Sequence, residues 1–418
     1  MVAEIAYGAG RLPVRLPAGV AADSVDAREP EPLASPERAI AEALRRPIDA
    51  PPLADLAKGR SSAVILVPDG TRPIPLPLVL PPILESIERS IPRERIEVLF
   101  ATGMHRPVGA EEARRLLGPE LADTVRWVSH DCEKTRTIGR TGRGTPVSLS
   151  ETYLGADLRV AVGLVEPHLL AGFSGGRKLV APGVIGIEAM PILHGPEIIG
   201  HRMARVGILD GNPFHEEALA IASAARLDFA VSVTIGRGRR VAGVFAGEFD
   251  RSHRAACDVV ARDSRVRTRG GRDLVVTSGG GAPLDATFYQ SVKGIAGAEP
   301  LLRKKGAVLL CASCREGWGS EPFTSLLAET PDLESFLAWA GREGSFRRDQ
   351  WMVQHLREAM ERVDVYLYSD RIDPEEARRF GLRPVSSPEE GIGAALEGGR
   401  DPSVAIIPEG PYTWAAPA

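Results

Sequence analysis

The amino-acid sequence predicts an α/β protein with two domains, each built on a mostly parallel sheet. Short apolar segments alternate with helical patterns along most of the chain, which is typical of a parallel sheet flanked by helices. A polar, basic, glycine-containing stretch at 265–271 then precedes a new apolar strand, and we place a domain boundary there. Each domain is therefore expected to be Rossmann-like.

The first domain is predicted to span residues 1–268. Strands are expected at 62–69, 96–103 and 157–168, the last ending at His168, and a helix pattern follows the first of them. The segments 228–236 and 241–247 are expected to form an antiparallel pair, because the few residues between them are too short for a crossover. The proline-rich segment 28–39 is expected to be a connecting loop.

The second domain is predicted at residues 271–402. Its strands are expected at 273–281, 306–313 and 363–369, with helices around 333–340 and 349–363. Residues 403–418 are expected to supply a closing strand and a tail that returns to the first domain.

Composition narrows the class of protein. A chain of 418 residues with 44% hydrophobic residues and a net charge of -4, without blocks of like charge, indicates a globular protein without a nucleic-acid partner. No apolar run reaches the ~18 residues that span a bilayer, and the N-terminus lacks signal-peptide features, so we expect no membrane partner and a cytoplasmic location. Cys311 and Cys314 form a CxxC without a second pair; buried strand-end cysteines are expected, and a redox or metal role stays open.

Chemically capable side chains follow several predicted strands. Asp69 and Arg72 follow the first strand, His105 follows the second, and His168 ends the third. Three glycines, 279–281, end the first strand of the second domain, and Gln290 and Lys293 lie just beyond them. Ligands of open parallel sheets bind at the carboxyl ends of strands, so these residues predict a site there, although each alone also suits a structural role.

The stretch 166–180, EPHLLAGFSGGRKLV, places His168 and Lys178 ten residues apart across Gly175 and Gly176. The glycines interrupt any helix, so we expect a tight loop that turns Lys178 into the same pocket as His168. A surface lysine at a turn is the alternative. His194 is expected just before a helix that begins at Pro196, where its ring could bind a metal, although no paired ligand motif accompanies it. The other histidines, at positions 130, 201, 215, 253 and 355, are assigned to surface or structural roles.

Ten motifs, in one order, together resemble the lactate racemase family, whose members carry a nickel-pincer nucleotide. They are DGTRPIP, ATGMHRP, EPHLLAGFSGGRKLVAPG, ILHGPE, GILDGNPFHEEA, VFAGE, HRAAC, DATFYQSVKG, DQWMVQ and VAIIPEGPYT. The resemblance runs nearly end to end. Residues 315–323 are the least similar part, and Cys311 and Cys314 match no family role.

The resemblance implies a cofactor and active site in the cleft between the two domains. Its cofactor is pyridinium-3,5-bisthiocarboxylic acid mononucleotide with nickel, and dedicated maturation enzymes are implied as partners. His105 and His168 match the general acid and base, Lys178 the covalent attachment point, and His194 the nickel ligand. Further cofactor contacts are implied for Asp69, Ser174, Gly175 and Gly176. Substrate contacts are implied for Arg72, Gln290, Lys293 and Trp351.

The implied activity is racemisation or epimerisation of a small 2-hydroxy acid, such as lactate, through hydride transfer and a 2-keto acid. Removing the C2 hydrogen as a hydride avoids a carbanion beside a carboxylate, and two histidines can serve the two enantiomers. Two alternatives remain: an NAD-dependent 2-hydroxyacid dehydrogenase, for which the glycine fingerprint is missing, and a non-catalytic nucleotide-binding relative. The sequence leaves the particular hydroxy acid and the oligomeric state open.

Overall fold

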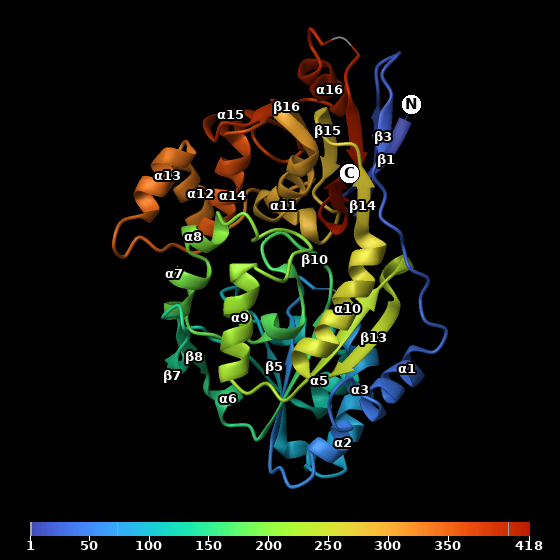
Figure 1. The fold of residues 1–418 in the computed structure, drawn as a ribbon, viewed down its shortest axis with the longest axis vertical. Helices are drawn as coiled ribbons and strands as arrows, with labels where there is room; N and C mark the ends of the chain where they lie inside the picture. The colour runs from blue at the N-terminus through green and yellow to red at the C-terminus, as the bar shows by residue number, and fades with distance from the viewer. Residues whose placement is uncertain (1, 73, 400) are drawn as a thin grey trace.

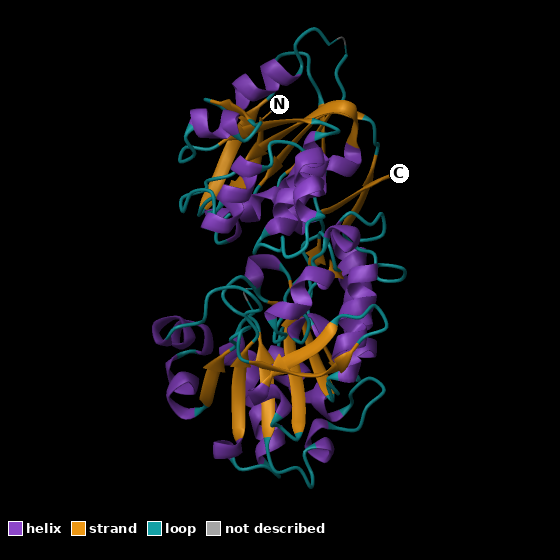
Figure 2. Cartoon of the chain, turned by 90° about the vertical axis from the view of Figure 1, so that its left-hand side faces the viewer, coloured by secondary structure: helices purple, strands orange, loops and turns teal. Residues whose placement is uncertain are grey.

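Two six-stranded sheets, one in each half of an elongated molecule, organise the chain (Figure 1). The computed structural model describes residues 2–72, 74–399 and 401–418. Helices cover both sheets, and loops and short helices fill the junction between the halves (Figure 2). The prediction of a two-domain α/β fold with parallel-rich sheets is confirmed.

The first sheet has the order β13-β12-β9-β4-β5-β6. Its strands are β4 (Ala63–Val67), β5 (Ile96–Phe100), β6 (Arg126–Ser129), β9 (Leu158–Leu164), β12 (Phe229–Ile235) and β13 (Val241–Gly247). Only β12 and β13 pair antiparallel, as the short connection predicted. All five residues of β4 are buried, because helices cover both faces of a central parallel strand.

Helices pack on both faces of this first sheet. One face is covered by α1 (Pro36–Arg45), α2 (Leu53–Leu56), α3 (Leu76–Glu88) and α4 (Ala110–Leu117). The other carries α6 (Glu151–Leu154), α7 (Met190–Leu193), α8 (Pro196–Ile199) and α9 (Pro213–Ala224). Three further elements complete this half: α5 (Pro119–Thr124), the hairpin of β7 (Thr135–Arg140) and β8 (Pro146–Ser150), and α10 (Phe249–Ser264) against β12 and β13.

The second sheet is wholly parallel, with the order β18-β17-β16-β15-β19-β3. Its strands are β3 (Ala22–Ser24), β15 (Arg272–Ser278), β16 (Leu302–Cys311), β17 (Asp364–Tyr368), β18 (Arg383–Val385) and β19 (Val404–Ile407). The helices of this half are α11 (Phe288–Ala298), α12 (Glu321–Glu329), α13 (Leu333–Ala340), α14 (Gln350–Met360), α15 (Pro374–Arg379) and α16 (Pro388–Ala395).

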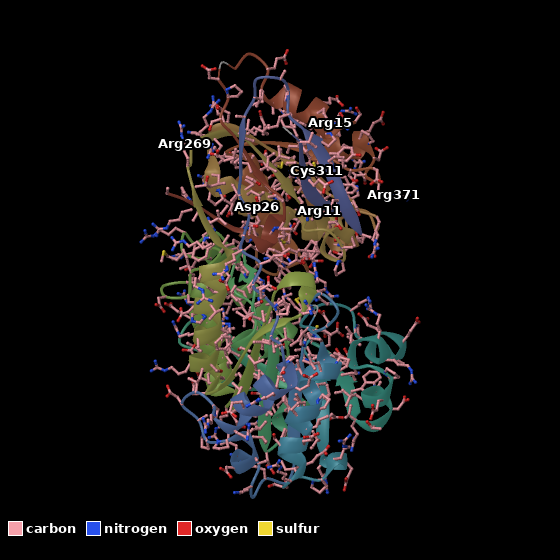
Figure 3. The ribbon with its side chains drawn as sticks, turned by 90° about the vertical axis from the view of Figure 1, so that its right-hand side faces the viewer. Arg11, Arg15, Asp26, Arg269, Cys311 and Arg371 are labelled. Carbon is pink, nitrogen blue, oxygen red and sulfur yellow. The ribbon has the colours of Figure 1, made fainter. Side chains whose placement is uncertain are left out.

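The start of the chain lies with the second sheet, which corrects its placement in a first domain of residues 1–268. β3 pairs with β19, and the hairpin of β1 (Val2–Tyr7) and β2 (Gly10–Arg15) buries Ile5 and Val14 against that sheet. Figure 3 shows Arg11 and Arg15 of the hairpin in the same half as Cys311 of β16. The N-terminal segment packs on the second sheet because its apolar residues cover a face of that sheet that would otherwise be exposed.

The end of the chain contacts both halves. β19 completes the second sheet, whereas β20 (Trp414–Pro417) pairs with β14 (Arg265–Thr268). The Trp414 ring also packs edge-on against Phe173 at 6.3 Å. Residues 403–418 therefore connect the second sheet to the loop that follows β9.

The third predicted strand is shorter than expected. β9 ends at Leu164, and Pro167–His168 form a separate two-residue strand, β10, paired antiparallel with β11 (Gly172–Phe173). Pro167 has no backbone N–H to donate, which helps end the ladder before His168. His168 therefore belongs to a small two-stranded ribbon beyond the edge of the sheet.

Among the described residues, none of the helices combines the length and the apolar character that a membrane-spanning helix requires.

Candidate active site

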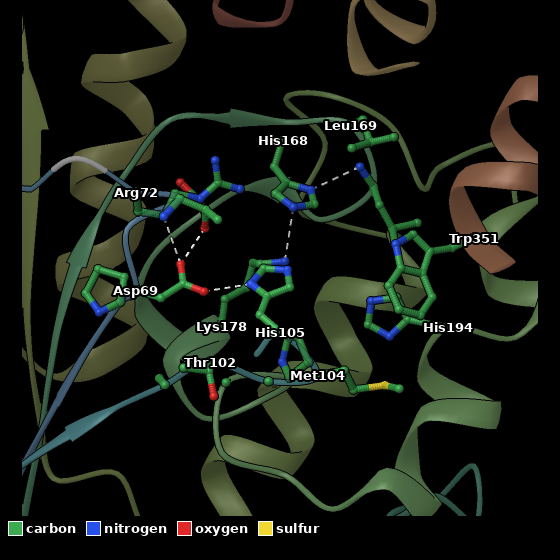
Figure 4. Close-up of a pocket in the computed structure, with 18 of the residues that line it drawn as sticks. Asp69, Arg72, Thr102, Met104, His105, His168, Leu169, Lys178, His194 and Trp351 are labelled. Carbon is green, nitrogen blue, oxygen red and sulfur yellow. Dashed lines mark hydrogen bonds and ion pairs between the residues drawn. The ribbon is translucent and has the colours of Figure 1, made fainter. Parts of the chain in front are cut away.

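A pocket of about 170 Å³ lies at the carboxyl edge of the first sheet, between the two halves of the molecule. Residues after β4, β5 and β9 form one wall, and side chains of α11 and α14 from the other half form the opposite wall. Figure 4 shows His105, His168 and Lys178 directed toward the same space, with His194 and Trp351 beside it. The strand-end residues predicted to converge thus lie around one cavity.

His105 and Asp69 form a hydrogen-bonded pair on the more exposed side of this pocket. The Nδ1 atom of His105 lies 2.7 Å from Oδ2 of Asp69, and the side chain of His105 is 43% exposed. Burial would raise the pKa of Asp69, but hydrogen bonds and charge from His105, with hydrogen bonds from Thr71, lower it from 3.8 to about 2. The permanently ionised carboxylate orients the ring and leaves Nε2 of His105 available for proton transfer.

His168 occupies a partly buried and electropositive position. Its Nδ1 accepts backbone hydrogen bonds from Leu170 and Ala171, both at 3.2 Å, and its Nε2 lies 3.2 Å from Nζ of Lys178. Burial first, and then the charges of Lys178 and nearby cations, hold the pKa of His168 well below 6.5. His168 therefore stays neutral at physiological pH.

Lys178 lies on a one-turn 3-10 helix, Gly176–Leu179, after the predicted tight loop. Its Nζ is 4.9 Å from the centre of the Phe214 ring, and no carboxylate pairs with it within the described residues. Burial, followed by the charge of Arg72 and other cations, holds its pKa well below 10.5. A partly buried amine with a depressed pKa is a nucleophile suited to covalent attachment, and this one lies in the pocket wall and not on the open surface.

The loop before Lys178 is held by its own hydrogen bonds. The Ser174 hydroxyl donates to the Leu164 carbonyl at 2.8 Å and accepts from the Glu166 amide at 2.9 Å. Gly175 has φ +79 and lines the pocket together with Ser174. Gly176 faces the other way, because a Cβ there would lie 2.6 Å from the ring of His253. Of the three predicted loop contacts, two are thus at the cavity and Gly176 serves packing.

His194 lies between α7 and α8, just before the helix that begins at Pro196, as predicted. Its ring packs against Phe214 at 5.0 Å and Trp351 at 4.5 Å, and its Nδ1 is buried without a hydrogen-bond partner. Burial, with the charge of Lys178, holds its pKa well below 6.5. A neutral imidazole is the form that binds a metal. No cluster of three or more His, Cys, Asp or Glu side chains suited to a metal exists among the described residues.

Two cations from different halves face the cavity. Nη1 of Arg72 lies 3.4 Å from Oε2 of Glu166, and the ammonium of Lys293 donates to the side chain of Gln290. Burial and the charge of Arg72 lower the pKa of Lys293 to about 7, against the opposing charges of Glu166 and Asp69. The guanidinium has further donors beyond the one that meets Glu166, so it can still bind a carboxylate.

Sequence reasoning missed two residues that line the pocket, Tyr289 and His355, and one that pairs with a lining residue, Glu166. Glu166 was quoted in a motif but given no role, and only the fold brings it to Arg72. Tyr289 had no assigned role, yet its hydroxyl accepts a hydrogen bond from Nε1 of Trp351 at 3.0 Å. His355 was assigned a surface or structural role, but it lines the pocket one helical turn after Trp351. The spacing of four residues on one helix was the available signal for His355.

Two other candidates lie outside this pocket. Cys311 and Cys314 are both buried and free, as expected for strand-end cysteines, and neither lines the cavity. The glycines at 279–281 are covered by the N-terminal hairpin and the loop near Gly410. The glycine-rich strand end is therefore a close-packed turn.

Sequence comparisons agree along most of the chain. Residues 7–207 match the lactate racemase N-terminal domain, and residues 268–412 match the lactate racemase C-terminal domain. The lactate racemase of Thermoanaerobacterium thermosaccharolyticum is 32% identical over 383 residues, covering 90% of this chain and 89% of that protein. The lactate racemase of Lactiplantibacillus plantarum is 31% identical over 382 residues, covering 90% of each.

Comparison with solved structures agrees with these sequence comparisons. The apoprotein of lactate racemase from T. thermosaccharolyticum matches with a TM-score of 0.91 at 30% identity, covering 99% of this chain and 100% of that one. A protein from Thermotoga maritima matches with a TM-score of 0.72 at 19% identity, covering 93% and 100%, which shows a shared fold. Fold, site and relatives together define an enzyme of the isomerase class built from two α/β domains. The chain belongs to the lactate racemase family, as its motifs indicated.

Proposed function

We propose that this enzyme interconverts the enantiomers of a small 2-hydroxy acid, lactate or a related short-chain acid, by hydride transfer through a 2-keto acid. The observation that carries the proposal is the convergence of His105, His168 and the uncompensated Lys178 on one pocket that also holds Arg72 and Lys293. Racemases named for lactate are its relatives, which supports the reaction type and the substrate class.

The pocket residues fit the nickel-pincer nucleotide that the family resemblance implies. Lys178 would hold it covalently, because its amine lines the pocket and has no carboxylate partner among the described residues. His194 would bind its nickel, since the ring has a buried nitrogen without a hydrogen bond. Ser174 and Gly175 would let it approach the loop backbone closely. When bound, this group supplies a hydride acceptor beside the substrate.

The chain's own residues bind the substrate and move its hydroxyl proton. Arg72 and Lys293 would hold the carboxylate from two sides, one through paired donors and one as a point charge. His105 and His168 would take the hydroxyl proton from one enantiomer each and return it to the other. Asp69 would hold the ring of His105 in place, whereas burial and the cations around His168 favour its neutral form.

Isotope transfer tests the route of the hydrogen. Racemisation of L-lactate in D₂O by the cofactor-loaded enzyme should leave C2 without solvent deuterium, because the hydride returns from a site that does not exchange with water. Proton NMR of the recovered D-lactate measures this. Deuterium at C2 in step with turnover would indicate a carbanion and contradict the mechanism.

Intact mass tests the attachment point. Protein co-expressed with the maturation enzymes that we propose as partners should carry an adduct of several hundred daltons, and Lys178→Ala should lose it together with all racemase activity. Lys293→Gln is the matched control, because it removes the other lysine amine of the same pocket and should keep the adduct. An adduct that survives Lys178→Ala would remove this lysine from the mechanism.

We also propose a cytoplasmic location, which the four free cysteines support.

A further inference from the structure

A second, larger cavity lies between the two halves of the molecule, next to the catalytic pocket. Its volume is about 490 Å³, against about 170 Å³ for the pocket. α11 and α14 contribute one wall, and the loop at 205–208 with β20 contributes the other. Leu169 and His355 line both cavities, so they form the shared wall.

A third, small cavity of about 20 Å³, which we call the throat, shares lining residues with each of the other two. The residues that it shares with the catalytic pocket are Arg72, His168, Leu169 and Lys293, and those that it shares with the larger cavity are Leu169, Val206, Gly297 and Thr413. The throat is therefore lined by the two cations proposed to hold the substrate carboxylate, and also by Glu166, the ion-pair partner of Arg72.

The larger cavity has an excess of positive charge. Its two carboxylates are already engaged, since Glu299 pairs with Arg362 at 2.5 Å and Glu358 accepts a hydrogen bond from an amide of its own helix at 2.8 Å. Arg205 and Arg265 line the same space, and within the described ranges neither pairs with a carboxylate. Two guanidinium groups thus remain for an anion.

The surroundings of these two arginines leave their donors usable. Arg205 donates to the carbonyl of its neighbour Ala204 at 3.1 Å, which occupies one of five N–H groups. Arg265 stacks on the ring of Trp414 at 4.6 Å, which fixes its plane without occupying its edge. His355 adds a polar group to the shared wall, because its Nε2 is buried without a hydrogen-bond partner while the residue is only 7% exposed.

We propose that the larger cavity is a vestibule that binds the substrate carboxylate at Arg205 and Arg265 and delivers it through the throat to Arg72 and Lys293. The proposal rests on the function proposed above, because it takes the same 2-hydroxy acid. A cavity with an excess of positive charge concentrates small anions and speeds their association. The apolar side chains of the throat suit the alkyl part of the acid.

Gly297 offers a way to close the throat. It lies on α11, and a Cβ at this position would meet nothing within 4 Å, so Gly297→Phe adds bulk without backbone strain. Gly393→Phe on α16 is the matched control, because its Cβ also meets open space and the residue lines neither cavity. Replacing a helical glycine favours the helix in both variants, so both should fold.

Kinetics of the cofactor-loaded enzyme test the proposal. Gly297→Phe should lower kcat/KM for lactate by about tenfold or more, with a larger loss as the acid lengthens, while Gly393→Phe keeps the wild-type value. The double variant Arg205→Gln/Arg265→Gln should lower kcat/KM at low salt, keep kcat, and reduce the dependence of kcat/KM on NaCl.

The possible results distinguish failure of the vestibule proposal from failure of the proposed racemase function. An enzyme that racemises lactate, but whose kcat/KM and salt dependence are unchanged in Gly297→Phe and in the arginine pair, would overturn the vestibule and uphold the function. The opening beside His105 would then be the route of access. A cofactor-loaded enzyme that racemises no 2-hydroxy acid would overturn both.

Discussion

The carboxyl ends of the two sheets are used differently, although both sheets are rich in parallel strands. At the first sheet, the chain after β4 and β5 supplies Asp69 and His105 to an open pocket. At the second sheet, β15 ends at Ser278 and three glycines follow, which is where a ligand could approach a backbone closely. There the protein's own N-terminus fills the space.

Hydrogen bonds fix this N-terminal cover. The Gly8 carbonyl accepts from the Ala282 amide at 2.7 Å, and the Gly8 amide donates to the buried Asp285 carboxylate at 2.7 Å. A Cβ on Gly281 would lie 3.3 Å from both the Ala6 side chain and the Gly8 carbonyl. The glycines after β15 therefore permit close packing of chain on chain.

The difference teaches that strand ends identify candidate sites, while other segments decide which of them stays open. The second half contributes to the pocket through helix side chains, with Gln290 and Lys293 on α11 and Trp351 on α14. The proposed acid–base histidines lie on the first half, and the proposed carboxylate contacts come from both halves, Arg72 from the first and Lys293 from the second, so the proposed site depends on how the halves meet. Each prediction below perturbs one of the two edges.

The largest effect is expected at the open edge. His105→Ala and His168→Ala should each lower the racemisation rate by about 10²–10⁴-fold, because each removes a proton-transfer group, while the cofactor adduct remains. Chiral chromatography of the product and intact mass measure the two quantities. His201→Ala changes an exposed histidine outside the pocket and should behave as wild type. Near-normal turnover in either pocket variant would exclude that histidine as an acid or base.

Much of the open edge was predictable from local sequence. The fully apolar run at Ala63–Val67 predicts a central strand, and a strand end followed by Asp69 predicts a polar group at the sheet edge. The glycine pair before Lys178 predicts the loop that returns this lysine to His168. These predictions succeed because period, burial and turn residues are properties of neighbouring positions.

The rest depends on contacts between distant segments. β3 pairs with β19 across almost the whole chain, and nothing in residues 22–24 specifies that partner. The ion pair of Arg72 with Glu166 exists only because β4 and β9 are adjacent in the sheet. The place of His355 in the pocket wall was not predicted, because its surroundings come from both halves. Single-sequence patterns carry no information on such pairings.

An intermediate effect is expected at the covered edge. Asp285→Ala should lower the free energy of unfolding by about 3 kcal/mol, because the partly buried amide of Gly8 and the buried amide of Ser313 lose their acceptor. Asp370→Ala is the control, since its bond to the Tyr7 hydroxyl is exposed and should matter by about 1 kcal/mol or less. Calorimetric melting measures both. Equal melting temperatures for the two variants would mean that Asp285 does not hold the cover in place.

The smallest effect is expected in the pH dependence of substrate binding at Lys293. Burial and the positive charge of Arg72 lower its pKa to about 7, while Glu166 and Asp69 oppose the shift and Gln290 accepts its hydrogen bond. A depressed ammonium pKa means that the charge is present below pH 7 and is lost as pH rises through it. We therefore expect kcat/KM to fall severalfold above about pH 7, since this constant reports the free enzyme.

Lys293→Arg distinguishes this cause from titration of a histidine. A guanidinium stays charged across the accessible range, so the variant should keep a flat alkaline side whatever its absolute rate. His105 and His168 are intact in the variant, so any alkaline decline due to them would persist. If kcat/KM of Lys293→Arg still falls as the pH rises above about 7, a group other than Lys293 causes the fall. If the fall disappears in this variant, Lys293 on α11 of the second half sets the pH dependence of the pocket at the first sheet.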